Sequence, residues 1–201
     1  MKALAQSASY ARVKEALDRF IALGLLILFL PVMVLTALAI LVLDGRPIFY
    51  RQNRYGEKGR VFSLYKFRTM KNRAEEGSIC TAEGDERITW LGKFLRPTRL
   101  DEFPQLWNVL VGDMSLIGPR AEWVRCVEKY EEEIPYYHLR HEVPPGLTGW
   151  AQVNYPYGSS VEDTKEKLRY DLFYIRNHSF LLDFQIVLKT IHVVLAKVGG
   201  K

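Results

Sequence analysis

The chain has 201 residues, of which 48% are hydrophobic, and it carries a formal net charge of +5. This length fits one domain with its own hydrophobic core, so we expect one catalytic or binding unit. The positive charge favours anionic lipid headgroups or phosphorylated substrates as partners, with nucleic acid as the weaker alternative. The two cysteines, Cys80 and Cys126, are too few for a disulfide framework and lack metal-ligand spacing, which fits a reducing cytoplasmic compartment.

An uncharged apolar run, Phe20 to Leu43, is long enough at about 1.5 Å per residue to cross a bilayer core of about 30 Å. It is too long for a signal peptide, and no small-residue cleavage site follows it. Pro31 lies near its middle and lacks an amide hydrogen, so we expect a kink or a break there. The weakly amphipathic residues 1–19 predict an interfacial helix that leads into the run.

Basic residues flank this apolar run on both sides: Arg12, Lys14 and Arg19 before it, and Arg46, Arg51, Arg54, Lys58 and Arg60 after it. A spanning helix normally has its excess of Lys and Arg on one side only. The symmetric flanks and the central proline therefore favour a re-entrant hairpin, which enters one leaflet and returns to the same face. A Pro-kinked spanning helix is the alternative.

Two runs rich in β-branched and aromatic residues, 47–51 and 61–70, flank a glycine-containing connection and predict a β-hairpin. In the second run, period-two alternation places Lys66 and Arg68 on one face, where they could meet a phosphate. A solvated strand face is the alternative. Residues 71–88 are polar without clear periodicity and predict a loop or lid.

The residue types that phosphate chemistry needs are concentrated in residues 89–120. Arg96 precedes a proline and predicts the end of a short helix, because the residue before a proline avoids the α region. A new helix should begin near Asp101, with Pro104 in its first turn. Asp101 and Glu102 would point about 100° apart, so one can reach a reacting atom while the other holds a metal. A simple helix-capping role for these acids is the alternative.

Three arginines near this helix start favour a catalytic role of the two acids over simple helix capping. Arg96, Arg99 and Arg120 are close in sequence to the two carboxylates. A helix amino terminus beside guanidinium groups is a favourable binding site for a pyrophosphate. We therefore expect these arginines to bind substrate phosphates.

A long set of residues resembles the bacterial sugar transferase family of monotopic phosphoglycosyl transferases: Arg96, Thr98, Asp101-Glu102, Pro104-Gln105-Leu106, Asn108, Gly112-Asp113-Met114-Ser115 and Gly118-Pro119-Arg120. The similarity runs from about residue 16 to residue 195, through YKFRTM, PGLTGWAQVN and YDLFYIRN. Within the family it is closest to the catalytic domain of the exopolysaccharide-priming transferases. It leaves open whether this chain is a full protein or the catalytic core of a longer one.

The resemblance implies an enzyme at the cytoplasmic face of the bacterial inner membrane. It would move a phosphosugar from a UDP-sugar to undecaprenyl phosphate, a polyprenyl phosphate, and release UMP. In the family, the aspartate of the Asp-Glu pair forms a covalent phosphosugar intermediate and the glutamate helps to bind Mg²⁺. These roles are carried over to Asp101 and Glu102, and phosphate-binding roles to Arg96, Arg120 and Lys66. A carboxylate nucleophile is physically reasonable, because it divides a transfer between two bulky substrates into two steps.

The last third of the chain predicts helices over 122–133, 162–176 and 181–198, the last of them apolar enough to lie in the membrane interface or to pack as a core helix. Between the first two, a proline- and glycine-rich turn presents Gln152 and Asn154. These two residues could contact sugar or nucleotide, with packing an equal alternative. The resemblance adds Asp171 to the nucleotide- or sugar-binding residues.

Together these features predict an α+β, mainly helical, membrane-associated fold with a small β-hairpin. We expect residues 1–45 to form the interfacial helix and membrane hairpin, and residues 46–201 to form the catalytic domain with its amphipathic helices. Two positions depart from the family pattern: Leu30 replaces a serine before the hairpin proline, and Pro144 replaces a basic residue.

Two alternative functions remain beside the transferase. One is a membrane-anchored module that binds anionic lipid or nucleic acid without catalysis, and the other is direct, single-step transfer. A carboxylate pair among arginines argues against the binding module, so we expect UDP-sugar, polyprenyl phosphate and membrane lipid as partners and no nucleic acid. The identity of the sugar is not readable from the sequence, and a homo-oligomer stays open.

Overall fold

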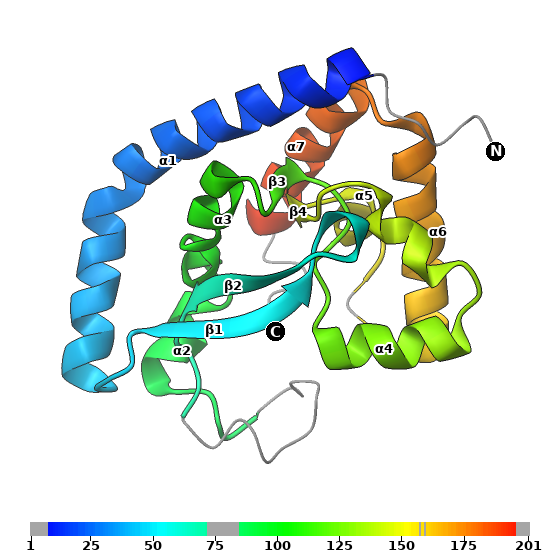
Figure 1. Ribbon diagram of the computed structural model, residues 1–201. Coiled ribbons are helices and arrows are strands. Elements are labelled where there is room, and N and C mark those ends of the chain that lie inside the picture. Colours follow the sequence, from blue (N-terminus) through cyan, green and yellow to red (C-terminus); the bar gives the residue numbers. More distant parts are fainter. Residues whose placement is uncertain (1–7, 72–84, 157, 159, 196–201) are drawn as a thin grey trace.

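The computed structural model describes residues 8–71, 85–156, 158 and 160–195, and it is mainly helical (Figure 1). The α-helices are α1 (Ala8–Leu43), α2 (Trp90–Leu95), α3 (Gln105–Val111), α4 (Val124–Glu133), α5 (Trp150–Asn154), α6 (Val161–Asn177) and α7 (Phe180–Leu195). The strands are β1 (Phe49–Tyr55), β2 (Val61–Phe67), β3 (Ser115–Ile117) and β4 (Gly146–Thr148). Short 3₁₀ turns are η1 (Glu57–Gly59), η2 (Leu100–Glu102) and η3 (Tyr137–Glu142). Cys80, most of the predicted loop and the start of the predicted interfacial helix lie outside the described residues.

The apolar run and the residues before it form one continuous helix, α1, with Pro31 inside it. Figure 1 shows that α1 bends in its middle part and continues beyond the bend. A proline removes one backbone hydrogen bond of the helix, and the Thr36 hydroxyl donates to the carbonyl of Val32 at 2.8 Å, a contact that also bends helices. The expected kink is therefore present, whereas a break is not. Residues Ser9–Leu43 are long and apolar enough to cross a membrane, and 6% of the most apolar window is buried.

Both arms of α1 pack against the same body. In the amino-terminal arm, Ala22 belongs to a buried cluster with Leu106 and Val109 of α3. In the carboxy-terminal arm, Ile40 is fully buried against Leu91, Leu95 and Phe67. Because these clusters hold both arms, α1 cannot separate from the rest of the fold at either end without exposing buried apolar surface.

A buried polar network fixes the first turns of α1. Lys14 Nζ lies 3.3 Å from Asp18 and 3.2 Å from Asp183 of α7. The Ser115 hydroxyl of β3 donates to Asp18, and the Tyr10 hydroxyl donates to Asp183 at 2.8 Å. These charges are less than a tenth exposed, and pairing makes their burial tolerable.

The predicted β-hairpin is confirmed, with β1 and β2 antiparallel from the Phe49–Phe67 pair to the Tyr55–Val61 pair. Lys66 lies within β2, as expected. Arg68 lies beyond the strand and is buried, and its guanidinium donates to backbone carbonyls, including that of Asp44 at 2.6 Å. The predicted shared phosphate-facing role of Lys66 and Arg68 is therefore wrong for Arg68, because the loop after α1 takes its hydrogen bonds.

A second sheet of two very short strands was not predicted. β3 and β4 are parallel, and Gly118 N–H donates to Thr148 while Gly146 N–H donates to Pro119. A Cβ on Gly146 would come within 2.0 Å of the Gly118 nitrogen, so the backbones meet only because both residues are glycine. This close approach fixes the position of the segment that carries Arg120.

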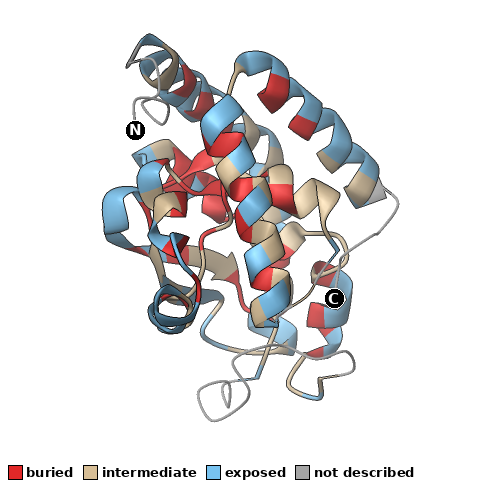
Figure 2. Ribbon diagram, turned by 90° about the vertical axis from the view of Figure 1, so that its right-hand side faces the viewer, coloured by how far each residue is buried: buried red, intermediate tan, exposed pale blue. Residues whose placement is uncertain are grey.

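The three long carboxy-terminal helices follow the prediction within about two residues, apart from residues 196–201, which are not described. Figure 2 shows buried residues between the elements and exposed residues along the outer sides of the helices. α7 buries Leu182 and Ile186 and exposes an apolar outer face: Phe180, Leu181, Phe184, Val187, Leu188, Ile191 and Val194. It therefore serves as a core helix on one side while the other side fits a membrane interface.

Candidate active site

The two central carboxylates lie on the 3₁₀ turn η2, directly before α3. Arg99 precedes the turn in a left-handed conformation with φ 58°. The predicted helix start near Asp101 is thus a 3₁₀ turn, and the α-helix proper begins at Gln105 with Pro104 as its N-cap. Phe103 and Pro104 keep right-handed helical backbone angles, so the side chains at positions 101 and 105 share one face.

Glu102 is the anionic centre of the site. Lys66 Nζ of β2 lies 2.6 Å from its Oε1, and Arg120 Nη2 lies 3.8 Å from the same oxygen. Burial disfavours the charged carboxylate, but Lys66 and Arg120 outweigh that penalty and hold the pKa of Glu102 at about 2. Burial also lowers the pKa of Lys66, and the Glu102 charge opposes that shift. The Lys66–Glu102 pair is therefore a buried ion pair.

Asp101 differs from its neighbour. It is 8% exposed, and its Oδ1 is buried with no hydrogen-bond partner among the described residues. Burial raises the pKa of Asp101 to about 6, against the attraction of Lys66, Arg96 and Arg99. An unpaired buried oxygen costs about 1 to 3 kcal/mol, so this atom adds no hydrogen bond to the stability of the fold.

Gln105 completes this face; the sequence prediction named it as part of the family motif but gave it no role. It is 4% exposed, and its Nε2 is buried without a hydrogen-bond partner among the described residues. Helical spacing of four residues from Asp101 was the signal that could have found it. An unpaired amide donor one turn from an unpaired carboxylate oxygen suits a ligand that carries phosphate oxygens.

Arg120 is positioned through its backbone. Arg140 Nη2 donates to the Arg120 carbonyl at 3.0 Å and lies 2.8 Å from Asp171 Oδ2. Burial raises the pKa of Asp171 to about 6, although Arg140 favours its charged form. The structure therefore places the predicted binding residue Asp171 in a buried ion pair that supports Arg120. Arg140 was missed in the sequence because it stands far from the motif that it supports.

Gln152 and Asn154, both on α5, bond locally. Gln152 Nε2 donates to Leu147, and Asn154 Nδ2 donates to Trp150 at 2.8 Å. Lys189 of α7 donates to Asn154 Oδ1. Within the described residues, no hydrogen bond joins either side chain to Asp101 or Glu102. Their expected contacts with sugar or nucleotide remain a prediction.

The site fits a magnesium ion that takes some of its ligands from the substrate. No group of three or more His, Cys, Asp or Glu side chains gathers in the parts of the chain that the structure describes. Mg²⁺ commonly binds through one or two carboxylates together with substrate phosphates. The ionised Glu102 satisfies that requirement, so any such ion would depend on the substrate for further ligands.

Comparison with known proteins gives consistent similarities. The profile of the family described as bacterial sugar transferase matches residues 9–197. A UDP-N-acetylgalactosamine-undecaprenyl-phosphate N-acetylgalactosaminephosphotransferase of Aeromonas hydrophila is 43% identical over 199 residues, which are 98% of this chain and 47% of that protein. A UDP-glucose:undecaprenyl-phosphate glucose-1-phosphate transferase of Escherichia coli is 41% identical over 89% of this chain and 39% of its own length.

A shorter relative is also similar. The exopolysaccharide production protein PSS of Rhizobium leguminosarum bv. phaseoli is 37% identical over 94% of this chain and 98% of its own length. The chain thus spans less than half of the first two relatives and nearly all of this third one.

Proposed function

Because the chain belongs to the bacterial sugar transferase family, we propose that it transfers a phosphosugar from a UDP-sugar to undecaprenyl phosphate. The activities for which the Aeromonas and Escherichia relatives are named support this reaction class. One observation in the fold carries it: an unpaired, buried oxygen of Asp101 stands beside the ion-paired Glu102 and is surrounded by the charges of Lys66, Arg96 and Arg99. A structural cap would use the carboxylate to accept backbone N–H groups, whereas this oxygen accepts none among the described residues.

The proposed reaction has two steps. The Asp101 carboxylate attacks the β-phosphorus of the UDP-sugar, and the bond from that phosphorus to the bridging oxygen breaks. UMP leaves with the electron pair, and the phosphosugar stays on Asp101. An oxygen of undecaprenyl phosphate then attacks the same phosphorus, which frees the carboxylate and forms the lipid diphosphate sugar. With a pKa of about 6, Asp101 is largely ionised at pH 7 and can attack.

The surrounding residues hold the diphosphate. Lys66 and Arg120 contact Glu102, and Arg96 and Arg99 act electrostatically on Asp101, so four cations favour phosphate charge beside this carboxylate pair. Glu102 would hold Mg²⁺, which would further offset this charge.

The three other predicted binding residues, Asp171, Gln152 and Asn154, have different roles in this proposal. Asp171 acts through Arg140, which holds the Arg120 backbone. Gln152 and Asn154 remain candidates for sugar or nucleotide contacts from α5. Their existing bonds are to nearby carbonyls and a lysine, and a polar ligand can replace such partners.

The same proposal places α1 in the membrane as a re-entrant helix, with the catalytic body on the cytoplasmic face of the bacterial inner membrane. A straight spanning helix would put its two ends on opposite sides of the bilayer. The bend in α1 and the attachment of both arms to one body support an entry and return on one side. Basic residues on both flanks favour the cytoplasmic side for both ends.

The test is mass spectrometry of the purified protein after incubation with Mg²⁺ and a panel of UDP-sugars, without lipid acceptor. We expect an added mass of one phosphosugar, absent in Asp101→Asn, which would also identify the sugar. Acceptor-dependent UMP release without any adduct would instead support direct transfer. If neither signal appears, the protein is a binding module and the proposal is wrong.

A further inference from the structure

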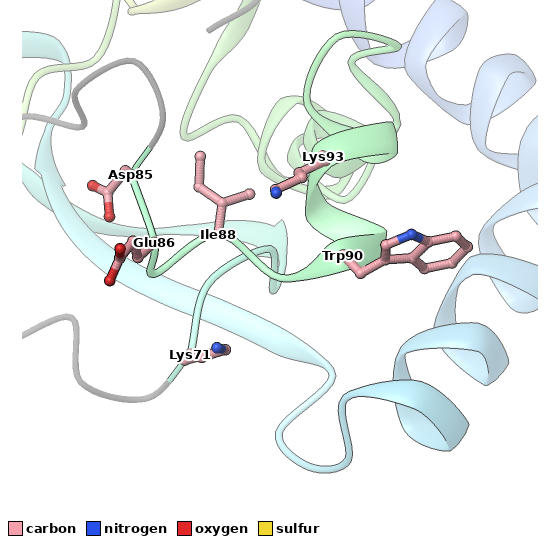
Figure 3. A pocket seen from close by; sticks show the side chains of 6 residues that line it. All are labelled: Lys71, Asp85, Glu86, Ile88, Trp90 and Lys93. Carbon is pink, nitrogen blue, oxygen red and sulfur yellow. The ribbon is translucent and has the colours of Figure 1, made fainter.

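An open pocket of about 550 Å³ lies at the start of α2 (Figure 3). Six residues line it: Lys71, Asp85, Glu86, Ile88, Trp90 and Lys93. The chain after β2 forms one side, where Lys71 N–H donates to the Arg87 carbonyl at 2.8 Å. Figure 3 shows the Lys93 and Ile88 side chains toward the pocket and the Trp90 indole on the other side of the helix start. Neither Asp101 nor Glu102 lines this pocket.

The charge of the pocket suits a phosphate. Asp85 is already neutralised, because the Arg87 guanidinium lies 2.6 Å from its Oδ2 and 2.9 Å from its Oδ1. Among the described residues that line the pocket, Lys71 and Lys93 are then accompanied by one remaining acid, Glu86, which is exposed to solvent. Lysine is a common phosphate ligand in proteins, and the described lining residues thus carry a small excess of suitable cations.

Arg96 connects this pocket to the carboxylate pair. It is the C-cap residue of α2 and follows Lys93 by three positions, so the two cations lie on neighbouring parts of one helix surface. Arg96 interacts electrostatically with Asp85 at the pocket and with Asp101 in the active site. Lys93 and Arg96 therefore carry positive charge from the pocket toward the attacking oxygen of Asp101, which would attract a bound phosphate in that direction.

The outer face of α2 suits a hydrocarbon chain. Trp90 is 78% exposed and Phe94 is 59% exposed, and their spacing of four residues places them on one face. The adjacent face, about 100° round the helix, carries Leu91 and Leu95 and packs against Ile40 in the carboxy-terminal arm of α1. Exposed aromatic residues beside a lysine are typical of the membrane–water interface.

We propose that this pocket is the entry site for the polyprenyl phosphate acceptor. Its phosphate binds Lys93 and Lys71, its prenyl chain lies along Trp90 and Phe94 beside α1, and Arg96 guides the phosphate toward Asp101. This inference rests on the proposed transferase function. It gives the acceptor an entrance distinct from the Lys66–Arg120 side of Glu102.

The test is steady-state UMP release in nanodiscs, with UDP-sugar and undecaprenyl phosphate varied separately. Lys93→Glu should lower kcat/KM for the acceptor by about tenfold, since a charge-assisted contact contributes at least that much. Phe94→Ala should lower it by a similar factor of about ten, since it removes apolar surface that the prenyl chain would bury. The kcat/KM for the UDP-sugar should stay within about twofold of wild type, because donor binding and its first transfer do not use this pocket. Two controls match these changes: Lys129→Glu on α4 reverses an exposed lysine, and Phe184→Ala on α7 removes an aromatic side chain that is also 59% exposed.

Three results would overturn the inference while wild-type turnover upholds the proposed function. The acceptor kcat/KM could remain unchanged in both pocket variants. Donor and acceptor values could fall equally, which would mean that the pocket only supports the fold of the active site. The control variants could match the pocket variants, which would reduce the effect to general membrane attraction. Absence of turnover in the wild type would instead refute the proposed function itself.

Discussion

The ammonium of Lys66 lies 2.6 Å from Oε1 of Glu102, and this ion pair separates the properties of two adjacent carboxylates. The pKa of Glu102 falls to about 2, whereas burial raises that of Asp101 to about 6. These two neighbouring carboxylates thus differ: Glu102 is a permanent anion, and Asp101 titrates near neutrality. Such a separation is how proteins give two similar acids different chemical roles.

Transferase activity should fall as the pH drops through about 6. Asp101 becomes protonated there and loses its nucleophilic form, while Glu102 stays ionised to about pH 2. The check is kcat/KM for the UDP-sugar between pH 5 and 8. Lys66→Gln removes a charge that lowers the pKa of Asp101, so it should move this acid limb to higher pH. An unchanged limb in that variant would contradict the assignment of the limb to Asp101.

Asp101→Asn should abolish transfer and also stabilise the fold. The folded-state pKa of Asp101 is raised from 3.8 to about 6, so ionised Asp101 destabilises the protein above pH 6, and this effect disappears as the pH falls below 3.8. The variant should gain roughly 1 to 3 kcal/mol of unfolding free energy at pH 7 and almost nothing at pH 4. Denaturant unfolding in detergent at the two pH values measures this.

Glu102→Gln should have the opposite effect on stability and serves as the control for Asp101→Asn. Its pKa is lowered from 4.5 to about 2, so the ionised side chain stabilises the fold above pH 4.5 and loses that effect as the pH falls toward 2. Removing the charge leaves Lys66 buried without its counter-ion, which costs about 3 to 5 kcal/mol at pH 7. A gain of stability in Glu102→Gln, or a loss in Asp101→Asn, would show that the two carboxylates are assigned the wrong way round.

Gln105→Leu should lower activity about tenfold with little loss of stability. The amide Nε2 has no partner among the described residues, so a leucine gives up no hydrogen bond from that atom, but a phosphate loses its donor. Asn108→Leu on the same helix is the matched control. It should destabilise the fold because Asn108 bonds Tyr65 N–H and the Ser63 carbonyl. Equal destabilisation of both variants in thermal unfolding would assign Gln105 a structural role only.

Asp171→Asn should destabilise the protein by about 3 kcal/mol, since it leaves Arg140 buried without its anion. Activity measured well below the unfolding temperature should fall only modestly, because the effect on substrate passes through Arg140 and the Arg120 backbone. A large rise of KM for the UDP-sugar without loss of stability would instead place Asp171 in direct contact with substrate.

Local patterns predicted most of the elements and part of the site. Pro31 indicated the bend of α1, and the alternation of residues 61–67 indicated β2 with Lys66 on it. The prediction failed where distant groups compete. Arg68 had the spacing of a phosphate ligand, but the carbonyls of the loop after α1 take its guanidinium. The β3–β4 pair is too short for any periodic signal.

The sequence by itself determined that this protein has a long apolar segment, a basic surface and a carboxylate pair among arginines, because residue type and short spacing suffice for these. Only the tertiary structure decided which carboxylate is ion-paired and which keeps an unpaired oxygen. That difference arises because Lys66 contacts Glu102 from a hairpin 36 residues earlier in the chain, a pairing that the sequence does not show. Burial then strengthens the electrostatic attraction between the two charges. The pairing of Arg140 with Asp171 has the same origin.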